Sequence, residues 1–168
     1  MATPTHDASS NSGVKNNVSS TAGYSHTAGT LTNGIAIIRV TMQDSTPGDI
    51  TGVTYNGSAA TQIGSTVTYA TSRRLAMFYY LNPPAGSSAV VATFSESMNS
   101  HIVSVSTYSN THQVSPTGTS NSATDFDTVN PSEARVTITS AVGELVVAVC
   151  SFADATASGT TSHDSRAS

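Results

Sequence analysis

Short runs of alternating hydrophobic and polar residues fill most of the chain, and Gly, Asn or Pro separates one run from the next. A period of two residues is that of a β-strand, and no run shows the 3.6-residue period of a helix. The runs span residues 34–43, 50–55, 58–70, 73–81, 89–94, 101–109, 134–140 and 144–152, with a weaker one over 14–29. About nine strands at this spacing predict an all-β fold, a two-sheet antiparallel sandwich without substantial helix.

Two of these runs allow more detailed predictions. In 34–43, the alternation places Ala36, Ile38, Val40 and Met42 toward the core, provided that Arg39 is solvated. The run 73–81 is apolar on both faces, which indicates a central strand whose second face is covered by a loop or a partner.

The strongest turn signals lie between the middle strands. Asn56 and Gly57 form the dipeptide that most favours a tight hairpin, because both residues tolerate a positive φ. Pro83 and Pro84 end the preceding strand, since proline cannot donate to a β-ladder, and Gly86 reverses the chain. We interpret these five residues as structural turns.

The pattern divides the chain into three parts. Residues 1–13 are polar and lack a period, and are predicted to be a flexible or partner-ordered arm. Residues 14–153 contain the strands and form the sandwich domain, and 154–168 form a polar tail.

Composition excludes several classes of function. Charged residues make up 10% of the chain, Lys15 is the only lysine and the net charge is −4, so a nucleic-acid-binding surface is not expected. No apolar stretch reaches the length of a membrane span, and the first residues do not have the pattern of a secretory signal. Ser and Thr make up about a third of the chain, a composition that suits the outward face of strands.

Residues able to carry chemistry are scattered. The five histidines (His6, His26, His101, His112 and His163) show no metal-ligand spacing, and no cofactor is expected. Asp125 and Asp127 alternate in a way that suits calcium, although a solvated loop accounts for them better. Cys150 is the only cysteine, so no internal disulfide is possible, and its apolar neighbours favour a buried hydrophobic role over a reactive thiol.

Aromatic residues offer one candidate binding surface. Tyr55, Tyr69 and Tyr79 could form a platform on which a glycan stacks, although packing at the core or its rim is the commoner role of such tyrosines. The chain has no tryptophan, and its glutamates are not paired, which disfavours a glycosidase.

From residue 24 to 152 the order of strands and turns resembles a jelly-roll-like β-sandwich domain found in uncharacterised phage virion proteins and bacterial secreted proteins. The matching residues are Tyr55, Asn56, Gly57, Tyr80, Leu81, Pro83, Pro84, Gly86, Tyr108, Ser109, Pro116, Gly118, Gly143, Glu144 and Leu145. Members of that family carry further strands after the one that corresponds to 144–152. The resemblance therefore implies an open sheet edge, which we expect residues 1–20 of this or a neighbouring subunit to fill.

The resemblance and the composition together predict a non-enzymatic structural protein. We expect a phage virion surface subunit of the decoration, cement or fibre type, which forms homo-oligomers and contacts other virion or surface proteins. The alternative is a carbohydrate-binding module of an extracellular or cell-surface adhesion protein. A hydrolase on the same scaffold is the least favoured interpretation.

Overall fold

The computed structural model describes residues 3–44, 48–69, 72–122, 136–149 and 163–164. Every regular element within these residues is a strand, and there are twelve: β1 (Thr5–Asn11), β2 (Val18–Ser20), β3 (Ser25–Ala28), β4 (Ile35–Gln43), β5 (Ile50–Tyr55), β6 (Ser58–Ala59), β7 (Thr61–Tyr69), β8 (Arg73–Leu81), β9 (Gly86–Met98), β10 (Ser100–Ser109), β11 (Val146–Val147) and β12 (His163–Asp164). No helix of membrane-spanning length and hydrophobicity occurs in this described part of the chain.

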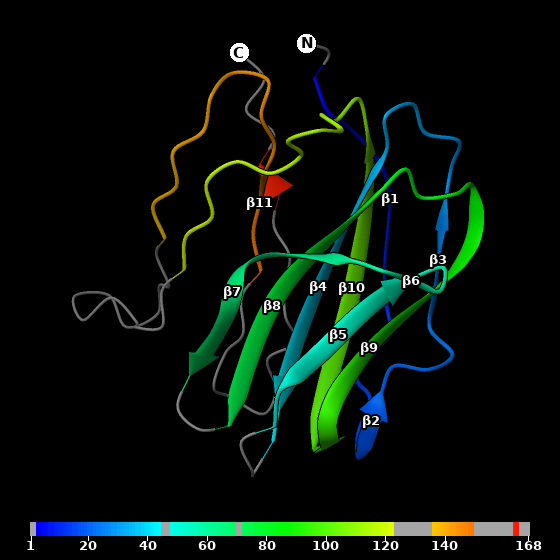
Figure 1. Cartoon of the computed structure of the whole chain (residues 1–168), viewed down its shortest axis with the longest axis vertical. Helices are drawn as coiled ribbons and strands as arrows, with labels where there is room; N and C mark the ends of the chain where they lie inside the picture. The colour runs from blue at the N-terminus through cyan, green and yellow to red at the C-terminus, as the bar shows by residue number, and fades with distance from the viewer. Residues whose placement is uncertain (1–2, 45–47, 70–71, 123–135, 150–162, 165–168) are drawn as a thin grey trace.

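The strands form two layers (Figure 1). The first sheet has the order β1-β10-β4-β8-β7, and the second has the order β2-β9-β5-β6 with β3 also paired to β9. All pairings are antiparallel, so the predicted two-sheet antiparallel sandwich is confirmed. The short strands β11 and β12 pair with each other, and within the described ranges neither has another partner strand.

The main core lies between the two sheets. Its members from β4 are Ala36, Ile38, Val40 and Met42, as the alternation predicted. The condition attached to that prediction is wrong, because Arg39 is only 2% exposed. Its Nη1 donates to Ser106 Oγ at 3.1 Å, whereas Nε and Nη2 have no hydrogen-bond partner. Burial lowers the pKa of Arg39, and the neighbouring Tyr108 hydroxyl opposes this effect.

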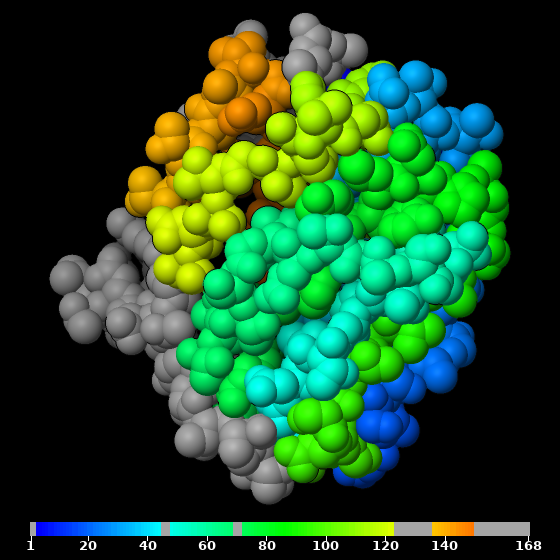
Figure 2. All heavy atoms as spheres, viewed as in Figure 1, coloured from blue at the N-terminus to red at the C-terminus, as the bar shows by residue number. Residues whose placement is uncertain are grey.

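A second, smaller cluster covers the outer face of the first sheet. Ile35, Ile37 and Tyr108 are buried there, and Leu145 and Val147 pack against them. Tyr79 and Leu81 of β8 belong to the same cluster, so the second apolar face of 73–81 is covered by a segment of this chain. In the space-filling view, residues 136–149 (orange) lie beside residues 110–122 (yellow-green) at one end of the molecule (Figure 2).

The C-terminal strands differ from the prediction. Residues 136–140 are not in a strand, and within 144–149 only Val146–Val147 pairs as β11. The rest of the two predicted strands lies outside the described residues. In the described part, Leu145 and Val147 pack on the face of the first sheet, so their hydrophobicity reflects burial on a sheet and not pairing within it.

The hairpin between β5 and β6 turns at Asn56 and Gly57, whose φ values are 50° and 79°. Both lie in the left-handed region, which suits a tight type I′ turn. Pro83 and Pro84 lie between the end of β8 and the start of β9, and Gly86 has a φ of 93°.

The N-terminal segment contacts both sheets of its own chain. β1 pairs with β10 from Thr5↔Ser109 to Asn11↔Ser104, and Lys15 continues the contact as a bridge to His101. β2 and β3 then pair with β9 in the second sheet. Where the sequence predicts a flexible or partner-ordered arm over 1–13, the structure therefore places Thr5–Asn11 as an edge strand, because β10 offers it a free row of backbone hydrogen-bonding groups.

Candidate functional site

Polar side chains from three strands and a turn meet at the edge of the sandwich that β1 forms. Asp7 and Ser10 come from β1, His26 from β3 and Thr107 from β10, and Tyr24 precedes β3. We call this group of five residues the clasp, because it connects β1 and β10 of the first sheet to β3 of the second. His26 and Thr107 are buried, whereas Asp7 is exposed and Ser10 is half-buried.

The clasp forms a continuous chain of hydrogen bonds. Ser10 Oγ lies 2.8 Å from Tyr24 Oη and 2.7 Å from His26 Nδ1. His26 Nε2 lies 3.2 Å from Thr107 Oγ1. Thr107 Oγ1 donates to Asp7 Oδ2 at 2.8 Å, and Gly29 N donates to the same oxygen at 3.0 Å.

The partners assign the direction of each bond. An ionised Asp7 can only accept, so Thr107 donates to it and accepts from His26 Nε2–H. His26 Nδ1 is then the acceptor for the Ser10 hydroxyl, and the Tyr24 hydroxyl donates to Ser10. Each hydroxyl and ring nitrogen in the series has a partner, as buried polar networks require.

Gly29 allows this arrangement sterically. A Cβ at position 29 would lie 2.6 Å from Asp7 Oδ1, closer than real side chains approach. The absence of a side chain therefore lets the backbone N–H reach the carboxylate.

Burial shifts the protonation equilibria in the clasp. Desolvation lowers the pKa of His26, and the Asp7 carboxylate opposes this effect. Desolvation also raises the pKa of Tyr24, and its hydrogen bond with Ser10 opposes this effect. Both shifts favour the neutral forms that the bond directions require.

The order serine, imidazole, carboxylate is that of a nucleophilic triad, but the geometry differs from one. The Thr107 hydroxyl stands between the imidazole and Asp7, so the carboxylate does not orient His26 directly. Ser10 Oγ already has two partners, and Ser10 does not line the groove described below. The hydrogen bonds of the clasp therefore connect strands of the two sheets.

His101 contrasts with His26. It is 2% exposed, and neither ring nitrogen has a hydrogen-bond partner. Its ring lies 4.5 Å from the Phe94 ring, centroid to centroid. Burial, with a smaller contribution from the Lys15 charge, lowers the pKa of His101 to about 4.

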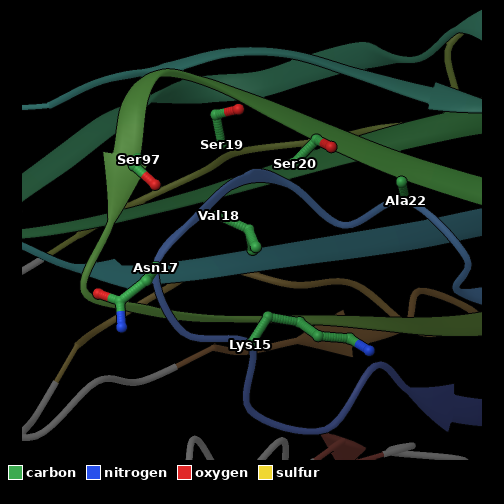
Figure 3. A pocket seen from close by; sticks show the side chains of 7 residues that line it. All are labelled: Lys15, Asn17, Val18, Ser19, Ser20, Ala22 and Ser97. Atoms are coloured by element: carbon green, nitrogen blue, oxygen red, sulfur yellow. The ribbon is translucent and has the colours of Figure 1, made fainter.

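A groove with a mixed polar and apolar lining lies beside Lys15 (Figure 3). It has a volume of about 540 Å³ and is lined by Lys15, Asn17, Val18, Ser19, Ser20, Ala22 and Ser97. The lining offers hydroxyl, amide and ammonium groups, but no aromatic side chain.

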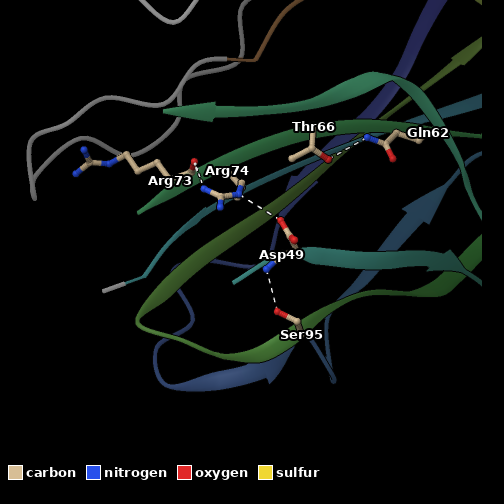
Figure 4. A network of polar contacts seen from close by, with 6 residues as sticks. All are labelled: Asp49, Gln62, Thr66, Arg73, Arg74 and Ser95. Carbon is tan, nitrogen blue, oxygen red and sulfur yellow. Dashed lines mark hydrogen bonds and ion pairs between the residues drawn. The ribbon is translucent and has the colours of Figure 1, made fainter. Parts of the chain in front are cut away.

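A second polar contact joins the two sheets near the start of β8 (Figure 4). Arg74 Nε lies 3.3 Å from Asp49 Oδ1, and the Asp49 backbone N–H donates to Ser95 Oγ at 2.9 Å. Arg74 is largely buried and the Asp49 side chain is mostly exposed. An ion pair with one solvated partner contributes little to stability, so this contact is weaker than the clasp.

The predicted tyrosine platform is not present. Tyr55 is 0% exposed and its ring stacks on Tyr80 in the main core, so it offers no surface to a glycan. Tyr79 belongs to the cluster on the outer face of the first sheet, on the opposite side of that sheet. The side chain of Tyr69 lies outside the described residues, as do Cys150 and the proposed calcium ligands Asp125 and Asp127.

Among the described residues, no group of three His, Cys, Asp or Glu could hold a metal ion. The clasp itself was not predicted from the sequence. Its members are separated by up to 100 positions, as for Asp7 and Thr107, and no short motif connects them. The segment of β1 that carries Asp7 and Ser10 has no hydrophobic period, so it gives no local signal of a strand.

Comparisons with known proteins add no family to this description: no family model, curated protein or solved structure matches the chain.

Proposed function

We propose that the protein is a non-enzymatic structural subunit that self-associates through the edges of its sandwich. One observation carries the proposal: the clasp, a connected group of acid–base and hydroxyl side chains, holds strands together. Asp7, Ser10 and His26 are all engaged in that way. A catalytic site would leave such groups facing a cleft.

The edge strands provide the surface for association. β1 is the outer strand of the first sheet, and its second row of backbone groups has no strand beside it in the described chain. Edge strands of this kind are templates for pairing with another chain. Most side chains of β1 are small and polar, so pairing at this edge is not driven by hydrophobic aggregation.

The setting that we propose is the surface of a phage-like particle, where the protein serves as a decoration, cement or fibre-type subunit. Two features support this setting: the low content of charged residues combined with abundant Ser and Thr, and the resemblance of the turn motifs to virion and secreted sandwich domains. Neither feature depends on a catalytic or cofactor site.

A carbohydrate-binding module is the second candidate, and the groove beside Lys15 is the observation that favours it. Ser19, Ser20 and Ser97 present hydroxyls there, and Asn17 presents an amide. Sugars bind through such groups, but tight sites usually add an aromatic face, which this groove does not have.

The mass of the full chain in solution, measured by light scattering over a concentration series with negative-stain imaging of the same samples, tests the first proposal. A discrete oligomer or a filament is expected. A monomer at every concentration contradicts self-association. Binding to a glycan array that is lost in Lys15→Ala and retained in the matched surface variant Thr51→Ala would then support the second candidate.

A further inference from the structure

The contact between β1 and β10 is extensive in backbone pairing but poor in hydrophobic contact. Pairing runs from Thr5 to Asn11, and backbone bonds continue through Ser12 N to Val103 O and between Lys15 and His101. Of the seven residues of β1, Ala8 is the only one with a purely apolar side chain. Release of β1 therefore exposes little apolar surface, so hydrophobic burial opposes it weakly.

The surface beneath β1 nevertheless requires an occupant. Thr107 and His26 are 0% and 1% exposed, and their polar atoms bond to Asp7 and Ser10. Without β1, Thr107 and His26 would lose these partners, and any of their polar atoms still shielded from water would be left unsatisfied, which is unfavourable. We use the term β10 edge for the edge of Ser100–Ser109 that faces β1. Leaving this edge unpaired is unfavourable, and its side chains favour a partner strand with matching polar groups.

The polar groups along the β10 edge indicate which strand pairs with it. It requires a carboxylate that accepts from Thr107 and Gly29 N, and a hydroxyl placed to donate to His26. β1 supplies both, with a bulge between His6 and Ala8 that brings Asp7 into position. A second copy of this chain carries the same strand with the same bulge.

A hinge lies directly after β1. Gly13 has a φ of 62°, is exposed, and has no atom within 4 Å of the place where a Cβ would be. A rotation at Gly13 can redirect residues 3–12, because glycine accepts both signs of φ. Exchange of an identical element about such a hinge is a low-cost route to dimers.

We propose that β1 is exchanged between two copies of the chain, so that Thr5–Asn11 of each pairs with the β10 edge of the other and rebuilds the clasp between subunits. The inference rests on the proposed function, since it names the partner and the strand through which self-association occurs. The hydrogen bonds within the clasp are the same in the exchanged and unexchanged forms, so the equilibrium between them depends on protein concentration.

A pair of complementary cysteine variants tests the exchange. Ser9 and Ser106 are register partners whose hydroxyls lie 2.8 Å apart, a separation at which cysteines can bond. One chain carries Ser9→Cys and the other carries Ser106→Cys, both in a Cys150→Ser background. The two proteins are mixed, incubated, oxidised and separated on a non-reducing gel.

Exchange predicts a covalent heterodimer whose yield rises with protein concentration, because neither chain can form this disulfide within itself. The matched control is Ser9→Cys alone, which should give no more covalent dimer than the cysteine-free background. Asn11→Cys with Ser104→Cys is a second register pair, for use if Ser106→Cys does not fold. Absence of the heterodimer with a folded pair overturns the exchange.

The result separates this inference from the proposed function. If light scattering shows oligomers but no covalent heterodimer forms, the exchange is contradicted, whereas self-association through another surface is supported. Monomers without a heterodimer would contradict both. A further variant carries both Ser9→Cys and Ser106→Cys in one chain. If it forms only the internal disulfide at every protein concentration, the exchange is likewise contradicted.

Discussion

Strand β10 has two neighbours, and they differ in nearly every respect except their backbone pairing. On one side lies β4, in which every residue from Ile35 to Val40 is buried. On the other lies β1, whose residues are exposed or half-buried and mostly polar. Both strands complete an antiparallel ladder, so the difference in their contribution to stability comes from side chains.

The magnitudes show which neighbour the fold requires. A backbone hydrogen bond contributes about 0.5–1.5 kcal/mol net in either ladder, and burial of one Ile or Val adds about 1.5–3 kcal/mol. β4 supplies several such side chains to the main core, and β1 supplies none. We infer that β4 is integral to folding and that β1 is a replaceable edge strand held by the specificity of its polar contacts.

The largest effect is expected on the β4 side. Ile38 is fully buried in the main core, so Ile38→Ala should lower the free energy of unfolding by about 2–5 kcal/mol, through lost hydrophobic burial and the cavity left behind. Ser9→Ala on the exposed face of β1 is the matched control and should change it by less than about 1 kcal/mol. Urea denaturation of both variants measures the difference. If both variants lose the same free energy of unfolding, β4 and β1 do not differ in their contribution to stability.

An intermediate effect is expected at His101, on the inward face of β10 next to the segment after β1. Its pKa is lower in the folded chain, at about 4, than its ordinary value of 6.5. As pH falls below about 6.5, the unfolded chain binds a proton that the folded chain does not bind until about pH 4. The stability that His101 contributes is thus complete above pH 6.5 and is lost on acidification, by about 3 kcal/mol at pH 4.

Denaturant titrations at several pH values between 7 and 4 measure this loss. His101→Leu should flatten the pH dependence, because leucine does not titrate and suits the contact with Phe94. Thr51→Ala is the control, since Thr51 is exposed and carries no titratable group. A profile as steep in His101→Leu as in the parent chain would contradict the assignment to His101.

The same contrast explains what could be predicted from the sequence. β4, β8 and β10 follow hydrophobic runs of period two, and the prediction located all three because burial on a sheet face leaves that pattern in the sequence. The turn between β5 and β6 could also be predicted. Asn and Gly are the residues that most readily adopt a positive φ, and Asn56 and Gly57 both do so in the structure.

The missed features depend on partners that are distant in the chain. The burial of Arg39 could not be predicted from 34–43, since its face of β4 is an apolar one that Leu145 and Val147 help to cover. The strand β1 has no hydrophobic period, because its backbone pairs with β10 while its side chains contact the sandwich through hydroxyls and a carboxylate. Its recognition requires Thr107 and His26, which only the folded chain places beside it.

The smallest effect on global stability is expected at Asp7. Its replacement is also the most direct test of the difference between β1 and β4. Asp7→Ala removes the acceptor for Thr107 and for Gly29 N, so β1 should detach more often while the sandwich stays folded. We expect a loss of about 1 kcal/mol or less in the free energy of unfolding, together with a clear rise in amide hydrogen exchange confined to β1 and its partners on β10. Thr5→Ala is the matched control, because its exposed hydroxyl bonds only to Thr3 O on the same segment. If Asp7→Ala instead lowers global stability as much as Ile38→Ala, release of β1 is inseparable from unfolding of the sandwich. The edge strand would then be as integral to the fold as β4.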